Sequence, residues 1–318
     1  MKGIWRTGGQ ALMVVLATAA LAMARPTSMP APGTLNYVEG QVRLNGQDLT
    51  AKSAGSAMVE PNQTLDTGQG NAEMLLTPGV FFRLGNNSEA RMVSPGLANT
   101  SVELVQGSGM LEVTELFKEN DLSVLVDGAT TRIEKTGLYD FNAAQPAVSV
   151  LDGKATVYEG DAHVTLKKGR EVLLASGQPF KAQKLNKEAV ETDPLYRWSK
   201  LRSEYESQAN IDAAQTIVVN GGWYGPGWYW DPFWDFYAFL PGDGILYSPF
   251  GWGFYSPWHV WGAPYHGHYR YPVAPGHGFR GGQVGRVAPP ARMAPMSGFH
   301  GGFQGSGGFH GGFGGARR

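Results

Sequence analysis

The sequence predicts an all-β domain that is followed by one helix and by a tail rich in glycine and aromatic residues. Between residues 34 and 183, short runs of alternating apolar and polar residues recur and break at glycine. From Asp193, apolar residues instead recur at three- and four-residue spacing, and from Asn220 the composition shifts to Gly, Pro and aromatic residues. Alternation is typical of strands that bury one face, and the longer spacing is typical of one face of a helix.

The first 24 residues have the layout of a secretory signal peptide. Lys2 and Arg6 precede an apolar stretch at 11–23, and residues 22–24 form a small-x-small cleavage motif. The apolar stretch is about 14 residues long, which is short of the ~20 residues that cross a bilayer. We therefore expect export with cleavage after this motif, a membrane anchor being the alternative, and no membrane-spanning helix in the mature chain. Residues 25–33, which contain three prolines, are expected to be a linker.

Four runs in the predicted β domain, residues 34–183, share an alternating apolar pattern around a glycine: 37–44, 74–84, 102–113 and 148–158. Glycine supplies the positive φ that tight turns between paired strands require, so each run is predicted to be a hairpin. Further strands are predicted at 122–126, 130–134, 138–142, 163–166 and 171–175. Short strands at this spacing indicate a β-sandwich or a short β-solenoid, and the sequence leaves both open.

An amphipathic helix is predicted at 193–215. Asp193 can cap it, Pro194 suits its first position, and its apolar stripe consists of Leu195, Trp198, Leu201, Tyr205 and Ala209. The pairs Lys200–Glu204 and Arg202–Glu206 are expected one turn apart on the exposed side. We expect the stripe to close the β core or cap an open sheet edge, and docking to another protein is the alternative.

The segment 220–271 is the candidate binding region, because seven of the nine tryptophans lie between residues 223 and 261. Trp and Tyr rings can stack on sugars, lie at a membrane surface or fill a partner's groove. The alternative is that they fold back and complete the β core. The residues of the candidate surface are Trp223, Trp228, Trp230, Trp234 and Tyr237. Residues 272–318, with their Gly/Phe/His repeats, are expected to be disordered.

Three blocks in order resemble the FecR domain family of periplasmic β domains in bacterial envelope signalling. Residues 72–88 are similar to its apolar strand that turns at glycine and continues to Leu-Gly, 102–113 to its glycine-turn hairpin, and 148–158 to its closing Asp-Gly hairpin. The resemblance implies an exported FecR-like β domain that makes protein contacts in periplasmic signalling or scaffolding, for example by strand addition at a sheet edge. Because a signal-like segment alone precedes the domain, we do not expect the anti-sigma role of members that carry a cytoplasmic helical segment.

Charge and residue types favour binding over catalysis. Residues 26–220 carry 24 acidic and 17 basic side chains, whereas six arginines and no acid follow Asp243. The arginines are too dilute to predict nucleic-acid binding, and the absence of cysteine excludes thiolate chemistry and disulfides. His163 is expected to be an exposed strand residue, and His266 with His268 lacks the further ligands of a metal site.

No catalytic residue, cofactor or metal site is predicted, and the acidic residues that alternate along the strands are expected to face solvent. The function predicted is that of a non-enzymatic protein of the periplasm or cell surface that contacts an envelope protein. The alternative is a surface or matrix structural protein that adheres to polysaccharide or outer membrane through its aromatic, basic tail. A glycan hydrolase comes third.

Overall fold

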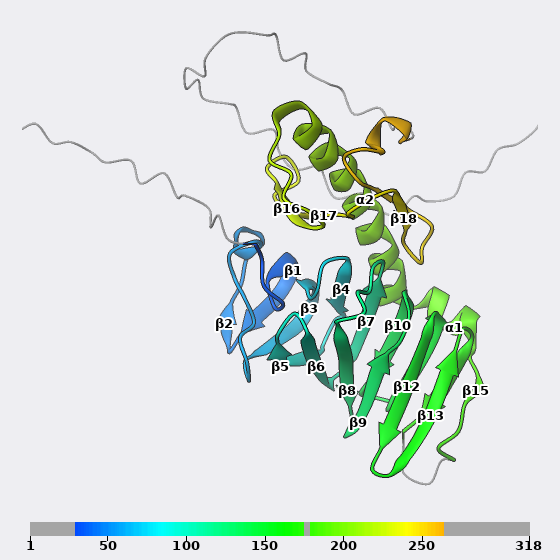
Figure 1. The fold of residues 1–318 in the computed structure, drawn as a ribbon. Coiled ribbons are helices and arrows are strands. Elements are labelled where there is room, and N and C mark those ends of the chain that lie inside the picture. The colour runs from blue at the N-terminus through cyan, green and yellow to red at the C-terminus, as the bar shows by residue number, and fades with distance from the viewer. Residues whose placement is uncertain (1–28, 175–178, 264–318) are drawn as a thin grey trace, which may run out of the picture. The chain divides into compact units, whose positions relative to one another are not determined.

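The computed structural model describes residues 29–174 and 179–263, which all belong to one unit of the chain. The fold is predominantly β, with one main helix after the sheet, as the sequence predicts (Figure 1). The predicted signal peptide at 1–24 and the predicted disordered tail at 272–318 lie outside the described residues. No described helix is long and apolar enough to cross a membrane.

Fifteen strands form one sheet. They are β1 (Leu35–Leu44), β2 (Gln47–Asp48), β3 (Thr64–Leu75), β4 (Val80–Leu84), β5 (Glu89–Pro95), β6 (Asn99–Gln106), β7 (Ser108–Val113), β8 (Asp121–Val126), β9 (Ala129–Ile133), β10 (Gly137–Asn142), β11 (Ala147–Asp152), β12 (Lys154–Glu159), β13 (Ala162–Lys167), β14 (Arg170–Leu173) and β15 (Gln183–Lys184). Their order is β13-β12-β9-β8-β6-β5-β3-β4-β7-β10-β11-β14-β15, with β1 beside β3 and β2 beside β1.

The sheet bends within the long strand β3 and folds back on itself. The first part of β3 pairs with β5, and its last part, Ala72–Leu75, pairs with β4. Residues from both ends of the sheet, such as Val157 of β12 and Val148 of β11, lie in one buried core. All pairs are antiparallel except β6 with β8. Two halves that face a common core correspond to the sandwich alternative, because the coils of a solenoid would stack in parallel.

Gly40 forms a bulge and not the predicted turn. Strand β1 continues through it and pairs with β3 on both sides, and the register shifts between Gly40 and Val42. The φ of Gly40 is +69°, and a Cβ there would lie 2.2 Å from the carbonyl oxygen of Gln69. The prediction of a hairpin at 37–44 is therefore wrong, because a positive φ serves a bulge as well as a turn.

Gly107 and Gly153 form corners that carry the chain between the two halves of the sheet. Gly107 joins β6 to β7, but β6 pairs with β5 and β8 whereas β7 pairs with β4 and β10. Gly153 joins β11 to β12, which also do not pair with each other. The hairpins predicted at 102–113 and 148–158 are therefore wrong, although their strands exist. The hairpin predicted at 74–84 is confirmed, since β3 and β4 pair around Gly79.

Two helices follow the sheet, α1 (Lys187–Thr192) and α2 (Pro194–Asn220). The predicted start of α2 is confirmed, because the Asp193 carboxylate accepts a hydrogen bond from the backbone N–H of Leu195 and Pro194 takes the first position. The predicted apolar stripe is right for Leu195 and Ala209, which are buried, and wrong for Leu201 and Tyr205, which are 46% and 39% exposed. The buried side of α2 is mostly made of small or polar residues. Its residues are Leu195, Ser199, Arg202, Ser203, Glu206, Ser207, Ala209, Asn210, Ala213, Ala214 and Ile217.

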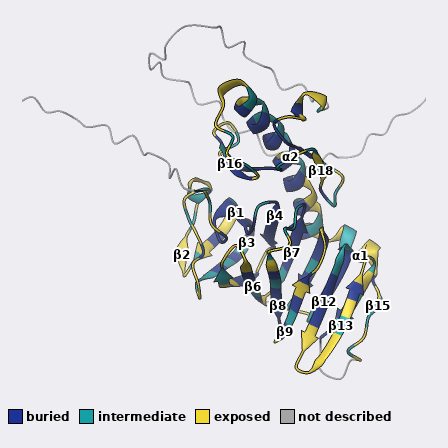
Figure 2. Cartoon of the chain, viewed as in Figure 1, coloured by how far each residue is buried: buried dark blue, intermediate teal, exposed yellow. Residues whose placement is uncertain are grey.

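Residues 221–263 form two short hairpins that pack on α2 and on the outer face of the sheet. Their strands are β16 (Gly227–Asp231), β17 (Phe236–Leu240), β18 (Ile245–Tyr247) and β19 (Gly253–Tyr255), and the short helices of the chain are η1 (Ala51–Ser53) and η2 (Val260–Gly262). We call α2 and residues 221–263 the cap. Most residues of β16 and β17 are buried (Figure 2). Some of them pack with α2 and others with Leu75 and Phe81 of the sheet.

A candidate functional site beneath the cap

Three charged side chains project from the outer face of the sheet into the contact with the cap. Glu73 of β3 lies directly across from Arg83 of β4, and Glu112 of β7 lies beside them. All three are 0% exposed. The opposite face of these strands belongs to the core, so both faces are covered here. The expectation that the alternating acidic residues face solvent is therefore wrong for Glu73 and Glu112, because alternation shows which residues share a face but not what covers it.

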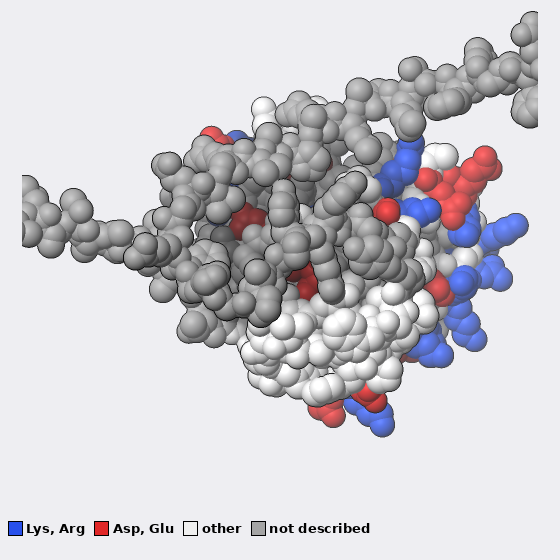
Figure 3. All heavy atoms as spheres, turned by 90° about the horizontal axis from the view of Figure 1, so that it is seen from above, with Lys and Arg blue, Asp and Glu red and all other residues white. Residues whose placement is uncertain are grey.

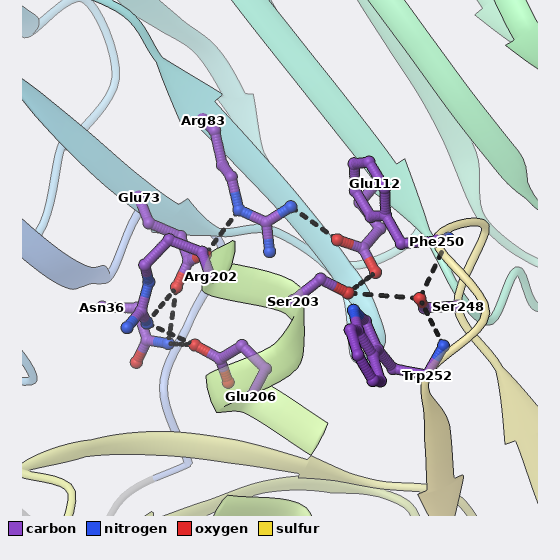
Figure 4. A network of polar contacts seen from close by, with 10 residues as sticks. All are labelled: Asn36, Glu73, Arg83, Glu112, Arg202, Ser203, Glu206, Ser248, Phe250 and Trp252. Atoms are coloured by element: carbon purple, nitrogen blue, oxygen red, sulfur yellow. Dashed lines mark hydrogen bonds and ion pairs between the residues drawn. The ribbon is translucent and has the colours of Figure 1, made fainter. Parts of the chain in front are cut away.

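Arg83 links the two glutamates. Its Nε lies 2.7 Å from Glu73 Oε2, and its Nη1 lies 2.5 Å from Glu112 Oε2 (Figure 4). Burial alone would lower the pKa of Arg83, but Glu112 and Glu73 outweigh it and hold that pKa above its ordinary value. Arg83 is therefore a permanent buried cation, compensated by carboxylates from both neighbouring strands.

Helix α2 adds a second cation and a third acid to the same network. Arg202 Nη2 lies 2.9 Å from Glu73 Oε1 and 2.6 Å from Glu206 Oε1. The next residue of the helix, Ser203, donates its hydroxyl to Glu112 Oε1 at 2.8 Å. The predicted pair Arg202–Glu206 does form, but it is buried and not on the exposed side of the helix, because the sheet offers it a matching charge.

The network holds two arginines and three glutamates, so one proton neutralises it. Glu73 Oε1 and Glu206 Oε1 both accept from the Asn36 amide, at 3.1 and 2.9 Å, and both contact Arg202. Burial and the neighbouring Glu73 raise the pKa of Glu206 well above its ordinary value. Burial alone would raise the pKa of Glu73, but Arg202 and Arg83 hold it well below its ordinary range. Glu206 is therefore the acid that keeps the proton.

Arg202 also lies between two aromatic rings. Its guanidinium carbon is 4.1 Å from the centre of the Tyr37 ring and 4.6 Å from that of Phe236. Tyr37 belongs to the sheet and Phe236 to the cap. A guanidinium is attracted to ring faces and does not lose its charge, so Arg202 of the helix binds both the sheet and the first hairpin of the cap.

Two buried asparagines connect the hairpins of the cap to their supports. The Asn36 amide accepts from the backbone N–H of Tyr237 at 2.8 Å and donates to its carbonyl at 3.2 Å. The side-chain amide of Asn210, on α2, binds both hairpins of the cap. It accepts a hydrogen bond from the backbone N–H of Tyr255 at 2.7 Å and donates to the carbonyls of Phe239 and Tyr255. A side-chain amide can satisfy both backbone groups of one residue, so each asparagine fixes a strand in position.

Two of the five predicted binding residues are buried and the other three are half-buried. Trp228 and Tyr237 are 2% and 7% exposed and pack with Leu75 and Phe81 of the sheet. Trp223, Trp230 and Trp234 are half-buried, and the Trp234 indole N–H donates to Asp212 of α2. The alternative weighed for these rings, that they fold back onto the β domain, describes Trp228 and Tyr237. Whether any of the five contacts a ligand stays a prediction.

Other aromatic rings of the cap face solvent. Phe233, Trp258 and Trp261 are 75%, 65% and 62% exposed, and Tyr224 and Tyr247 are each more than half exposed. Residues 221–263 contain three aspartates and no lysine or arginine. Figure 3, which views the side on which the cap lies in Figure 1, shows an uncharged area with charged side chains at its margin. Residues 221–263 therefore present apolar rings on a surface that lacks basic residues.

Two further acids have perturbed pKa values outside the network. Burial raises the pKa of Glu115 to about 7, and burial together with Asp193 and Glu171 raises that of Asp140 to about 7. Within the described residues, no three His, Cys, Asp or Glu side chains are arranged to hold a metal ion. His163, as expected, is an exposed strand residue.

Sequence reasoning missed the residues that join the helix to the sheet. The signal was present: Ser199, Ser203 and Ser207 recur every four residues, with Arg202 and Glu206 beside them. Small side chains at this spacing let a helix approach a partner closely. The apolar side chains of Leu201 and Tyr205 lie on the exposed side instead.

No family model matches the sequence, and no curated protein matches it. Two crystal structures of a candidate anti-sigma factor from Parabacteroides distasonis ATCC 8503 are similar to this chain. The first is 17% identical with a TM-score of 0.34, and the match covers 38% of this chain and 59% of that one. The second is 13% identical with a TM-score of 0.36, and the match covers 56% and 98%. This chain thus spans about three fifths of the first structure, and the likeness is too low to carry a functional conclusion.

Proposed function

We propose that this chain is an exported, non-enzymatic protein of the bacterial envelope that contacts other proteins in signalling or scaffolding. The sequence supports export through its signal-like first 24 residues. The three blocks that resemble the FecR domain fall on strands of the sheet, at β3–β4, β6–β7 and β11–β12. The proposed FecR-like domain is therefore the sandwich, and the cap is an addition that covers its outer face.

The exposed rings of the cap are the observation that carries this proposal. Trp258 and Trp261 flank Val260, which is buried against the cap's own core, and Phe233 packs edge-on against the half-buried Trp234. Rings on a fixed backbone lose little conformational freedom when they bind, and aromatic anchors dominate the energetics of protein interfaces. The cap therefore has the composition of a protein-binding surface.

The burial of the charge network argues against its use in catalysis. Glu73 and Glu206 lie close enough to share donors, as paired catalytic carboxylates would, but both are 0% exposed. A substrate would have to displace α2 to reach them. The carboxylates are also engaged by Arg83, Arg202 and Asn36, which supports a structural role.

Photo-crosslinking in the producing cell tests the proposal. A photoreactive residue at Trp258 or Phe233 should give discrete crosslinks to an envelope protein, and the same residue at Val93, which is 42% exposed on the sheet, serves as the control. Trp258→Ser with Trp261→Ser should abolish the crosslink formed at Phe233 without lowering the melting temperature. Equal crosslinking at Val93, or recovery of the chain in the cytosol, would contradict the proposal.

Adhesion to polysaccharide or outer membrane is the second candidate, favoured by the six arginines that follow Trp261 without an intervening acid. Arginine attracts anionic lipid or polysaccharide, and the rings suit sugar faces or headgroups. Fractionation separates the two candidates. Removal of residues 264–318 should release the chain from the envelope fraction if it adheres through its tail, and should leave protein crosslinks at Phe233 intact if it acts through the cap.

A further inference from the structure

The strand β13 ends the sheet and leaves one edge open. It pairs with β12 along its whole length, and no described strand pairs with its other side. His163, Thr165 and Lys167 are exposed, whereas Leu166 belongs to the core. Exposed residues run along this hairpin in Figure 2. An open edge presents unpaired backbone groups to another strand.

The backbone groups that point outward can be identified. The backbone N–H of Glu134 donates to the carbonyl of Lys154. The carbonyl of Lys154 and the backbone groups of every second residue after it in β12 therefore point toward β9. In an antiparallel ladder the N–H and C=O of a residue point to the same neighbour, and successive residues alternate. The remaining residues of β12 point their backbone groups the other way, toward Ala162, Val164 and Leu166 of β13. The backbone groups of His163, Thr165 and Lys167 therefore point to the open side.

The same edge carries opposite charges at its two ends. Glu159 and Asp161 lie at the beginning of β13, and Lys167 and Lys168 lie at its end, all of them exposed. Lys167 faces the like-charged Lys154 across the β12–β13 ladder. Within the described residues, neither Asp161 nor Lys167 is part of a salt bridge. The edge is thus acidic, then neutral, then basic along its length.

We propose that two copies of this chain pair through β13, antiparallel, to form a symmetric dimer with a continuous sheet. The register is centred on Thr165, which faces Thr165 of the second copy. On each side of this central pair, His163 of one copy faces Lys167 of the other. All these residues have outward backbone groups, so each pair exchanges two hydrogen bonds. Asp161 then lies diagonally across from Lys167 of the second copy, within reach of an ion pair.

Charge complementarity favours a second copy as the occupant. Antiparallel pairing of an edge with itself reverses the order of charges, which brings the acidic end of one copy to the basic end of the other. A foreign strand would need the same charge order by coincidence. The contact is smaller than a standard protein interface, so the dimer should be reversible and dissociate in about the micromolar range. It uses a surface separate from the exposed rings of the cap and goes beyond the function proposed above.

Sedimentation of the chain purified after export tests the dimer. The wild type should show a concentration-dependent dimer that weakens with added salt. Thr165→Pro removes an outward N–H and leaves the ladder to β12 intact, so it should weaken dimerisation about tenfold or more. Thr165→Val keeps the N–H and should dimerise as the wild type does. Circular dichroism and the melting temperature show that each variant is folded.

Charge reversal tests the register and does not depend on the proline variant. Asp161→Lys and Lys167→Glu should each be monomeric alone, because both symmetric contacts become repulsive. An equal mixture of the two should dimerise, because each Lys then meets an acid. A chain that stays monomeric at all concentrations, a Thr165→Pro variant that dimerises unchanged, or a mixture that does not recover would overturn the proposal. Protection of the β13 amides by a different protein, without self-association, would assign the edge to a foreign strand.

Discussion

Replacement of Arg83 by Met tests whether the charges beneath the cap hold it in place. Met keeps the apolar stem of the side chain and removes the guanidinium, whose carbon lies 5.3 Å from the centre of the Phe81 ring. Glu73 keeps Arg202 as a partner, whereas Glu112 keeps the Ser203 hydroxyl and no cation within this network. Removal of one partner from a buried ion pair typically costs about 3–5 kcal/mol of the free energy of unfolding.

Urea unfolding followed by tryptophan fluorescence measures the free energy of unfolding of the wild type and of the variant.

Arg91→Met is the matched control. Arg91 and Glu103 form a cross-strand ion pair in the same sheet, but their side chains are 45% and 27% exposed, so about 0–1 kcal/mol should be lost. The reasoning is refuted if Arg83→Met loses no more free energy of unfolding than Arg91→Met.

Three further variants test the acids and the hairpin anchors. Glu206→Gln should change the free energy of unfolding little at low pH and should be more stable than the wild type above about pH 4.3, because the folded wild type retains a proton that the unfolded chain releases. If the two proteins lose or gain stability with pH in parallel, Glu206 does not retain this proton. Asp140→Asn should remove a loss of stability that the wild type shows between about pH 4 and pH 7, measured by the same titration, and an unchanged curve would show that Asp140 is ionised in the fold. Asn210→Ala should lower the free energy of unfolding by about 1–3 kcal/mol and increase acrylamide quenching of tryptophan, because the Tyr255 N–H and two carbonyls lose their buried partner; unchanged quenching would show that the hairpins hold without it.

The strands could be predicted from the sequence, but their connections could not. Alternation places β8, β9, β10, β13 and β14 within a residue or two, because burial of one face is a local requirement. Gly107 has the same positive φ in a corner as it would have in a hairpin, so the local sequence does not show which strands it connects. Strand pairing depends on residues far apart in the chain.

The covered outer face of the sheet could not be predicted for the same reason. Glu73 and Arg202, which form an ion pair, are 129 residues apart, and an isolated glutamate in a strand is usually solvated. Apolar composition pointed to Leu201 and Tyr205 as the inner side of α2, but the sheet beneath presents charges, which select the face with Arg202 and Glu206. Matching polar partners decided which side of the helix is buried.

The central claim is that α2 docks on the sheet through its polar face, and a double-mutant cycle between Glu73 and Arg202 tests it most directly. The free energy of unfolding is measured for the wild type, Glu73→Gln, Arg202→Met and the double variant. A docked helix predicts that the two effects are coupled by about 1–3 kcal/mol, the double variant losing less than the sum of the two. Additivity within about 0.5 kcal/mol would show that strand β3 and helix α2 do not touch at these residues and would contradict the account.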